Sequence, residues 1–342
     1  MAAPDAGKVI TVRGLVEPQA LGRVMMHEHL HCDIWDWDRQ ELVLEERPMP
    51  EERREFLARE ALPPLKRCTE HGCFGFVEAS MAPSRAWPTW YAEASEATGV
   101  HIVLCTGYYR ELEVGAYWAK TEADAIWPFV RQASVEELAE LCVREIIEGV
   151  HGTSVRAGAI KLGSSRPQMT AAEEKTFRAG ARAQRATGVH ITTHCLKFGV
   201  ETSQLRVLEE EGVDLTRVAI GHTAWHLMDQ EMRKTVLEWM RRGANFLPTN
   251  LCIAGDPEVW RPLIEAIHEV FDAGLGEHLV IGTDWAFVAE SGPFGPCTYL
   301  PPPPFLQFFT SVLPAFRELG LTAEEEEQML ATNAQRLLAV TG

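Results

Sequence analysis

Short apolar runs alternate with amphipathic stretches along most of the chain. Eight runs are rich in β-branched and other apolar residues, and each has the length of a buried strand: Val24–Leu30, Cys73–Ala79, His101–Thr106, Arg156–Leu162, Val189–His194, Val218–His222, Ala244–Thr249 and Leu279–Asp284. From the fourth run onward they begin about 25 to 35 residues apart, which is the length of a strand followed by a crossover helix. The pattern predicts repeated β-α units.

The segments between the runs carry helix signals. The stretches Ser134–Glu137 and Thr170–Glu173 have the spacing of a capping box, in which a hydroxyl and a glutamate satisfy backbone N–H groups at a helix N-terminus. The second of these helices should end near Gly188, just before the next strand. Two more amphipathic helices are expected, from Asp229 to Arg242 and from Pro257 to Gly274.

Eight strands alternating with helices favour an α/β fold of the (β/α)8 TIM barrel type over an open sheet. We expect a single domain over residues 1–342, with a short lead-in over 1–20 and C-terminal helices over 305–342. In such barrels the active site lies at the C-terminal ends of the strands. The segment Phe287–Pro304 contains a tetraproline and follows the eighth predicted strand, so it is expected to be a loop beside that site.

Charge and composition restrict the range of functions. The net charge is -17 over 342 residues, which argues against nucleic acid or an anionic membrane as a partner. The eight cysteines include no CxxC pair, so we expect reduced thiols rather than disulfides. No apolar stretch is long enough for a signal peptide or a membrane span, so we expect a cytoplasmic protein.

Residues that bind metals well end several of the predicted strands. His27 and His29 lie two apart in one strand, so both imidazoles should point to the same face, which we expect to be the barrel interior. His194, His222 and Asp284 close three other predicted strands. Four histidines and one aspartate at one rim match the nitrogen and oxygen preferences of zinc or a similar transition metal, although each residue taken alone could be a satisfied core histidine or a capping aspartate.

Lys161 ends the fourth predicted strand and should also lie inside the barrel. A buried amine must be paired, shifted in pKa or modified. Two interpretations follow from the residues: an ion pair with Asp284 or Glu78, or a carbamate formed with carbon dioxide, whose two oxygens could bridge two metal ions.

Taken together, these residues resemble the phosphotriesterase family of the amidohydrolase superfamily. The HEH of the first strand, the lysine of the fourth, the histidines of the fifth and sixth and the aspartate of the eighth all match it. So do the stretches TVRGLVEPQALGRVMMHEHL, CTGYY, ATGVHITTH, IGHT and TNAQRLL, which occur in this order from about residue 10 to residue 340.

The resemblance implies a dinuclear centre. His27, His29 and Asp284 would hold the more buried ion, and His194 and His222 the more exposed one, with carboxylated Lys161 and a hydroxide bridging them. The ions would be zinc, or else cobalt, manganese or iron. Asp284 would shuttle the proton, and Tyr109 would lie close to the substrate unless it only packs a loop. A homodimer is also implied.

Some positions depart from the family pattern or remain open. Arg85 is kept after the second strand, but Ala86 stands where the family usually has an acid, and we assign Arg85 to substrate binding. Tryptophans follow several strands and suggest a pocket for an apolar or aromatic group, Trp285 being the expected pocket wall: Trp35, Trp37, Trp118, Trp225 and Trp285. Glu28 and Cys195 neighbour predicted ligands and should point away from the metals.

The sequence therefore predicts a metal-dependent hydrolase acting on a small molecule. A lactone or another carboxylic ester is the expected substrate, with a phosphotriester or an amide as alternatives on the same site. A binding protein that has kept a residual metal centre is a further alternative, and so is a single-metal enzyme without the carbamate.

Overall fold

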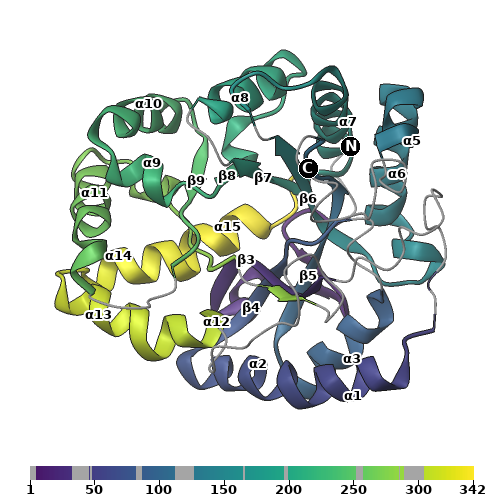
Figure 1. The fold of residues 1–342 in the computed structure, drawn as a ribbon, viewed down its shortest axis with the longest axis horizontal. Helices are drawn as coiled ribbons and strands as arrows, with labels where there is room; N and C mark the ends of the chain where they lie inside the picture. Colours follow the sequence, from purple (N-terminus) through teal and green to yellow (C-terminus); the bar gives the residue numbers. More distant parts are fainter. Residues whose placement is uncertain are drawn as a thin grey trace.

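The computed structural model of the chain contains the expected barrel of parallel strands. It describes residues 5–32, 46, 48–81, 87–111, 127–164, 166–195, 199–251, 257–284, 286–288 and 304–342. Seven strands lie side by side in chain order, and helices surround them (Figure 1): β3 (Arg23–Cys32), β4 (Cys73–Glu78), β5 (His101–Tyr108), β6 (Ala157–Ser164), β7 (His190–Cys195), β8 (Val218–Gly221) and β9 (Asn245–Leu247). The protein is a (β/α)8 TIM barrel.

The eighth predicted strand closes the barrel without forming a regular strand. The backbone N–H of Val280 donates to Phe246 on one side, over 3.1 Å, and the N–H of Met26 donates to Ile281 on the other, over 2.9 Å. The backbone hydrogen bonds between this segment and the chain after β9 become irregular at Pro248. Proline has no N–H to donate, so Pro248 only accepts a hydrogen bond, from the N–H of Gly282. Beyond this segment, β10 (Ala286–Val288) pairs with β3 as a short edge strand and takes up the first residues of the predicted loop.

Helices follow most strands and pack around the barrel. Their bounds are α1 Glu51–Glu60, α2 Leu62–Cys68, α3 Pro88–Thr98, α5 Trp127–Gln132, α6 Val135–Ile147, α7 Ala171–Thr187, α8 Val200–Glu210, α9 Ala224–Met228, α10 Gln230–Arg241, α11 Arg261–Asp272, α12 Pro304–Gln307, α13 Leu313–Glu318, α14 Ala323–Glu327 and α15 Asn333–Leu338. Within the described ranges, no helix has both the length and the apolar character needed to cross a membrane.

The predicted helix ends are confirmed. Ser134 and Glu137 form a complete capping box at α6, and Thr170 and Glu173 form another at α7. Helix α7 ends at Gly188, whose φ of 76° is the left-handed conformation that glycine adopts readily. These caps fix where the chain turns back into the barrel.

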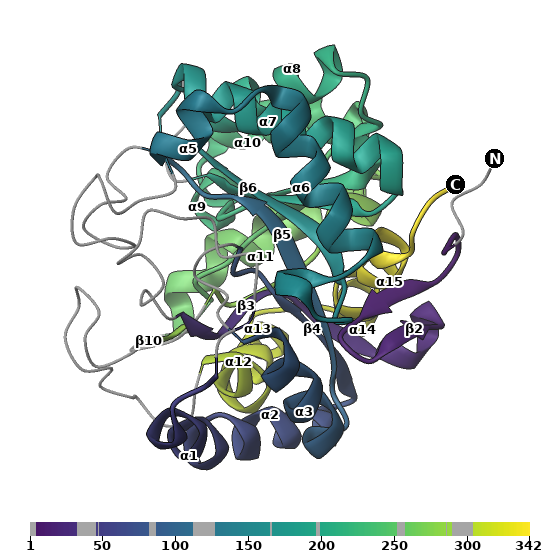
Figure 2. The ribbon, with the colours of Figure 1, turned by 90° about the vertical axis from the view of Figure 1, so that its right-hand side faces the viewer.

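One end of the barrel is closed by chain segments that are far apart in sequence. A hairpin of β1 (Val9–Thr11) and β2 (Gly14–Val16) lies beside the C-terminal segment (Figure 2), and Gly7 and Val340 are joined by a backbone hydrogen bond of 2.8 Å. Val9 and Leu337 belong to the same buried apolar cluster as inward-facing strand residues such as Val77. Apolar side chains therefore fill the barrel interior here, and buried polar contacts such as that of Asn333 with the carbonyl oxygen of Leu279 hold the C-terminal segment against it.

A tight contact between β5 and β6 gives a test of the strand packing. Gly107 has a φ of 117°, and a Cβ atom there would lie 2.1 Å from the carbonyl oxygen of Lys161. We expect Gly107→Ala to lower the free energy of unfolding by about 3 kcal/mol or more, because strain and overlap with backbone atoms add. Gly274→Ala is the control, since its φ is 72° but none of the described atoms lies within 4 Å of a Cβ there; it should cost only about 1 kcal/mol. Equal losses in denaturant unfolding would contradict the packing argument.

Candidate metal centre

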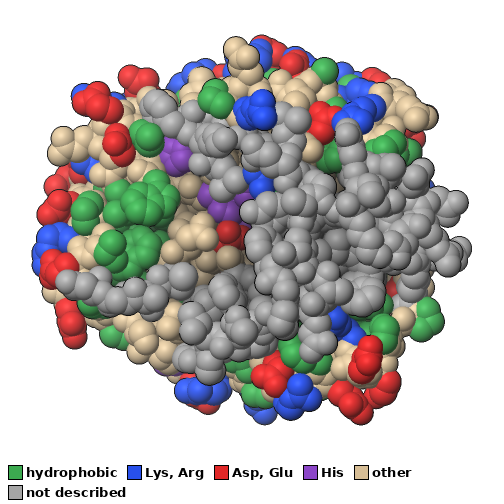
Figure 3. Space-filling model, in the orientation of Figure 1, with side chains coloured by type: hydrophobic (Ala, Val, Ile, Leu, Met, Phe, Trp, Pro, Cys, Tyr) green, Lys and Arg blue, Asp and Glu red, His purple; other side chains and the backbone are tan. Residues whose placement is uncertain are grey.

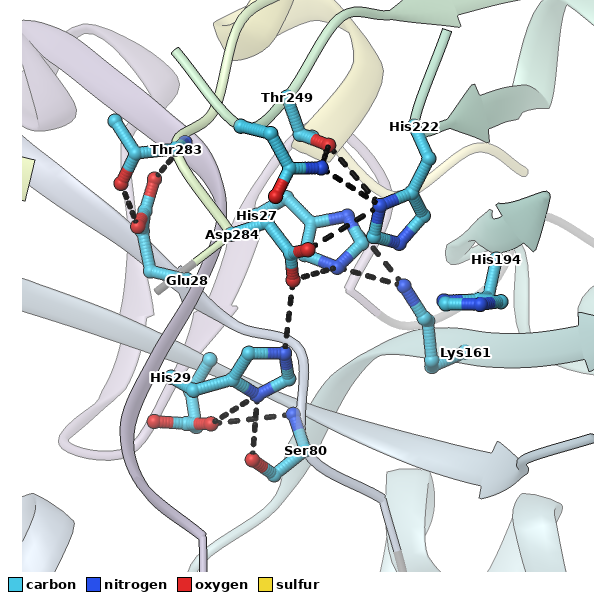
Figure 4. A network of polar contacts seen from close by, with 12 residues as sticks. His27, Glu28, His29, Ser80, Lys161, His194, His222, Thr249, Thr283 and Asp284 are labelled. Atoms are coloured by element: carbon cyan, nitrogen blue, oxygen red, sulfur yellow. Dashed lines mark hydrogen bonds and ion pairs between the residues drawn. The ribbon is translucent and has the colours of Figure 1, made fainter. Parts of the chain in front are cut away.

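The two histidines of β3 face the barrel interior because the strand changes phase. Val24 and Met26 belong to the cluster inside the barrel, whereas Met25 belongs to the outer one. Regular alternation would therefore turn Glu28 inward. The pairing of β3 with β4 shifts between Met25 and Glu28, and beyond this irregularity His27 and His29 point inward instead (Figure 4).

Asp284 connects three of the predicted ligands. Its Oδ1 atom lies 3.4 Å from Nε2 of His27 and 3.4 Å from Nε2 of His29. Its Oδ2 atom lies 3.2 Å from Nδ1 of His222. The Asp284 side chain is 20% exposed, so the carboxylate lies at the boundary between the barrel interior and solvent. On the face shown in Figure 3, histidine and acidic side chains reach the surface near the middle.

Two of these residues have a left-handed backbone. The φ of His222 is 63° and that of Asp284 is 55°, which is uncommon for residues other than glycine. Both lie where a strand segment ends, and the N–H of Asp284 donates to His27 over 2.8 Å. Strained backbone of this kind persists where surrounding contacts fix it, and it concentrates at functional sites.

The remaining predicted ligands complete the group. The ring of His194 lies 4.2 Å from that of His222, centroid to centroid, and the ring of His27 lies 4.9 Å from that of His222. Lys161 is buried, and its Nζ atom lies 2.8 Å from Nε2 of His27 and 3.3 Å from the carbonyl oxygen of Thr193. All six predicted metal ligands therefore come together at one rim of the barrel.

The amine of Lys161 has no carboxylate partner among the described residues. Neither Asp284 nor Glu78 forms an ion pair with it, and Glu78 instead interacts with His29 over 3.4 Å and accepts a hydrogen bond from the N–H of Ser80 over 3.1 Å. Burial lowers the pKa of Lys161 to about 8. No ion pair with either predicted carboxylate is formed, although the charge of Asp284 opposes the effect of burial on this pKa, and roughly a tenth of an amine with this pKa is neutral at pH 7.

The predicted ligands are in the protonation states that favour binding of a cation. Burial lowers the pKa of His27 and His194 well below the ordinary value and that of His222 to about 4. Burial alone raises the pKa of Asp284, but His222, His29 and His27 together lower it well below its usual value. Neutral imidazoles and an ionised carboxylate are the forms that ligate divalent metals.

The donor geometry also fits a metal ion. Ligand atoms of His27, His222 and Asp284 all lie within 4.8 Å of one another. Nδ1 of His222 has contacts with Asp284 and Thr249, whereas its Nε2 is buried and has no hydrogen-bond partner among the described residues. A buried nitrogen without a partner is costly, and a bound cation would satisfy it.

Neighbouring side chains that were not among the predicted site residues orient the ligands. Ser80 lies 2.7 Å from Nδ1 of His29, and Thr249 lies 3.1 Å from Nδ1 of His222. Glu28 points away from the group and accepts hydrogen bonds from the N–H and hydroxyl of Thr283 (Figure 4), as expected for a structural residue. The only sequence signal for Ser80 and Thr249 is that each follows a predicted strand or ends one.

The contact between Thr249 and His222 gives a direct prediction. Thr249→Val keeps the shape of the side chain but removes its hydroxyl, so the His222 ring loses an orienting contact. We expect the affinity of the metal-free protein for zinc, measured by titration calorimetry, to fall about 10- to 100-fold. Thr249→Ser retains the hydroxyl and should bind like the wild type. Wild-type affinity in the valine variant would contradict this role.

Tyr109 and Arg110 border the group on the side of His194. The Tyr109 hydroxyl lies 3.2 Å from Nδ1 of His194, and the guanidinium of Arg110 lies 5.5 Å from the Tyr109 ring centre. The positive charge of Arg110 contributes to the lowered pKa of both His194 and His222, after burial and nearer charges. Arg110 was not among the predicted site residues, although it directly follows the CTGYY stretch.

Most of the other residues predicted to bind the substrate fall outside the described part of the chain. Arg85 and Trp285 lie outside the described residues, as do Trp35, Trp37 and Trp118. Trp225 is described, and it is 68% exposed on α9. The structure therefore brings together the predicted ligands and Tyr109, and does not test the tryptophan pocket.

The chain is similar to several known proteins in sequence and in fold. The phosphotriesterase family profile matches residues 7–338. The N-acetyltaurine hydrolase of Mus musculus is 26% identical over 370 residues, covering 97% of this chain and 98% of its own. The aryldialkylphosphatase of Saccharolobus solfataricus is 30% identical over 211 residues, 60% of each chain. The crystal structure of a phosphotriesterase homology protein from Escherichia coli, complexed with phosphate in its active site, superposes with a TM-score of 0.71 at 26% identity, covering 93% of this chain and 99% of its own.

Proposed function

Because the chain belongs to the phosphotriesterase family, we propose that it is a metal-dependent hydrolase that cleaves an ester-type bond, with a lactone or another carboxylic ester as substrate. One observation carries the proposal: four histidines, a buried lysine and an aspartate from five different strand segments lie together, with their contacts centred on Asp284 and His27. Zinc is the metal we expect, given the mixture of imidazole and oxygen ligands.

Each ligand has a proposed place. His27, His29 and Asp284 would hold one divalent ion, and His194 and His222 would hold a second, more exposed one. Bound divalent ions lower the pKa of a coordinated water towards ~7 and polarise the carbonyl or phosphoryl oxygen of a substrate. Asp284 accepts the proton of the attacking water, and its partial exposure gives that proton a route to solvent. The Tyr109 hydroxyl, beside His194, positions the substrate oxygen.

Lys161 completes the centre as a carbamate in this proposal. The neutral amine attacks carbon dioxide, a nitrogen–carbon bond forms, and a proton leaves the nitrogen, giving an anion with two oxygens. Only the neutral amine reacts, and burial that lowers the Lys161 pKa to about 8 supplies it near neutral pH. The change replaces a buried potential cation with an anion, which suits a position between two metal ions.

Amide hydrolysis is the second candidate activity. Relatives that match nearly the whole chain include N-acetyltaurine hydrolases of Mus musculus and Dictyostelium discoideum, whose name denotes cleavage of an amide bond. Arg110 would favour an anionic group on such a substrate, because its positive charge lies close enough to affect His194 and His222.

An activity screen distinguishes ester hydrolysis from amide hydrolysis, and both from a binding protein without catalytic activity. We expect zinc-loaded protein to hydrolyse lactones or carboxylic esters faster than phosphotriesters or N-acyl amides. Asp284→Asn, prepared in the same way, serves as the control for contaminating hydrolases. A faster amide reaction would move the assignment to the second candidate. Inactivity on all four classes with full metal loading would overturn the proposed function and favour the binding protein.

A further inference from the structure

A second group of side chains with donor atoms suited to a metal ion lies outside the barrel, behind the strand that carries His194. Cys195 is the last residue of β7, Glu201 lies in the first turn of α8, and His226 lies on α9. These three elements can be followed in Figure 1. Cys195 is fully buried, Glu201 is 1% exposed and His226 is 3% exposed. Their burial sets them apart from the acidic groups that are common on protein surfaces.

Their donor atoms are spaced like the ligands of one small cation. Sγ of Cys195 lies 3.8 Å from Oε2 of Glu201, and Nε2 of His226 lies 3.6 Å from the same oxygen. All three donor atoms lie within 4.8 Å of one another. Ligands of a tetrahedral zinc ion, at about 2.0 to 2.3 Å from the metal, are about 3.5 Å apart. Small side-chain movements would bring these three atoms to that spacing.

We propose that Cys195, Glu201 and His226 form a separate, mononuclear site for zinc or a divalent ion of similar softness. A thiolate, an imidazole and a carboxylate are the ligand types that zinc combines in proteins. Binding forms bonds from the ion to sulfur, nitrogen and oxygen and releases the thiol proton to solvent. The cation would place a positive charge beside the buried Glu201 carboxylate, which contacts both Cys195 and His226.

The position of the group indicates what it would stabilise. Cys195 follows the candidate ligand His194, and His226 follows the candidate ligand His222 by four residues and has a polar contact with its backbone. Gln204 of α8 donates to the carbonyl oxygen of His194 over 2.8 Å. An ion at Cys195, Glu201 and His226 would therefore fix β7, α8 and α9 relative to one another, and with them the two histidines of the outer ion. We infer a structural role.

Cobalt substitution tests this site separately from the proposed catalytic centre. Protein is produced in zinc-depleted medium with added cobalt, and its near-ultraviolet absorption is recorded. We expect a thiolate-to-cobalt charge-transfer band, because cobalt bonded to Cys195 gives one. The candidate ligands of the catalytic centre are nitrogen and oxygen donors and give none. Cys195→Ser should lose the band together with about one equivalent of metal.

Two variants keep the result interpretable. Cys68→Ser changes another buried cysteine, one that contacts the carbonyl oxygen of Pro64, and should keep the band. Asp284→Asn disables the proposed catalytic centre and should also keep it. If the cobalt-loaded wild type has no band, or if the band persists in Cys195→Ser, the three residues are only a hydrogen-bonded cluster and the proposal is wrong. Neither outcome depends on hydrolytic activity.

Discussion

Replacing Lys161 with alanine should abolish most of the hydrolytic activity and release metal. In the proposed centre this side chain is the link between the two ions, and nothing else in the described site can take its place. We expect kcat/KM to fall about a thousandfold or more, equivalent to roughly 4 kcal/mol of transition-state stabilisation. Metal content should fall by more than about one equivalent per chain relative to the wild type.

Chemical rescue makes this prediction specific to the carbamate. Short carboxylic acids, added to Lys161→Ala, can occupy the empty space and supply the missing oxygens, so they should restore part of the metal content and activity. Lys161→Arg keeps the positive charge but cannot form the carbamate, and it should be inactive. Lys234→Ala, which removes an exposed lysine paired with Glu231, is the control and should behave like the wild type. Unchanged metal content in Lys161→Ala would support a single-metal site without the carbamate.

Asp284→Asn should have the second large effect. The carboxylate contacts His27, His29 and His222, and it is the proposed acceptor of the proton from water. An amide has nearly the same shape but neither the charge nor the basicity. We expect kcat to fall about a thousandfold, with a much smaller change in KM, because the loss falls on a step after substrate binding.

The control for this variant is another aspartate far from the rim. Asp272→Asn, at the exposed end of α11, should leave the kinetics unchanged. A second measurement separates chemistry from assembly: the metal content of Asp284→Asn should be determined alongside its rate. A variant that keeps its metal and retains more than about a tenth of the wild-type kcat would exclude Asp284 as the proton acceptor.

The order of the strands could be predicted from the sequence, because strand-length apolar runs and helix caps recur at regular spacing. The strand ends were informative as well, since parallel strands of a closed barrel bring their C-terminal residues to one rim. This is why His194, His222 and Asp284 could be grouped without any knowledge of their contacts. The eighth strand was placed correctly along the chain, but its irregular pairing depends on Pro248 and could not be read from an apolar pattern.

The orientation of the first two histidines was predicted correctly, but for an incomplete reason. Alternation within 27–29 puts both histidines on one face, yet it does not say which face that is. The structure turns them inward through the irregularity in β3, which follows from pairing with β4. Contacts such as Ser80 with His29 are equally hidden, because they join residues 51 positions apart. The cluster of Cys195, Glu201 and His226 likewise depends on how α8 and α9 pack.

Lys161 shows where sequence reasoning reaches its limit. The pattern identified a buried amine and left its partner open. The structure forms no ion pair between Lys161 and either predicted carboxylate, and burial lowers the pKa of the amine to about 8. The modification itself is a chemical event, so only a measurement on the protein can show it.

Anomalous X-ray diffraction at the zinc absorption edge tests the central claim most directly. Crystals of zinc-loaded wild-type protein should show a pair of anomalous peaks among His27, His29, His194, His222 and Asp284. Electron density on Lys161 should continue beyond Nζ into a carboxylate between the peaks. No peak among these residues in zinc-loaded crystals, or a single peak beside an unmodified lysine, would contradict the dinuclear hydrolase.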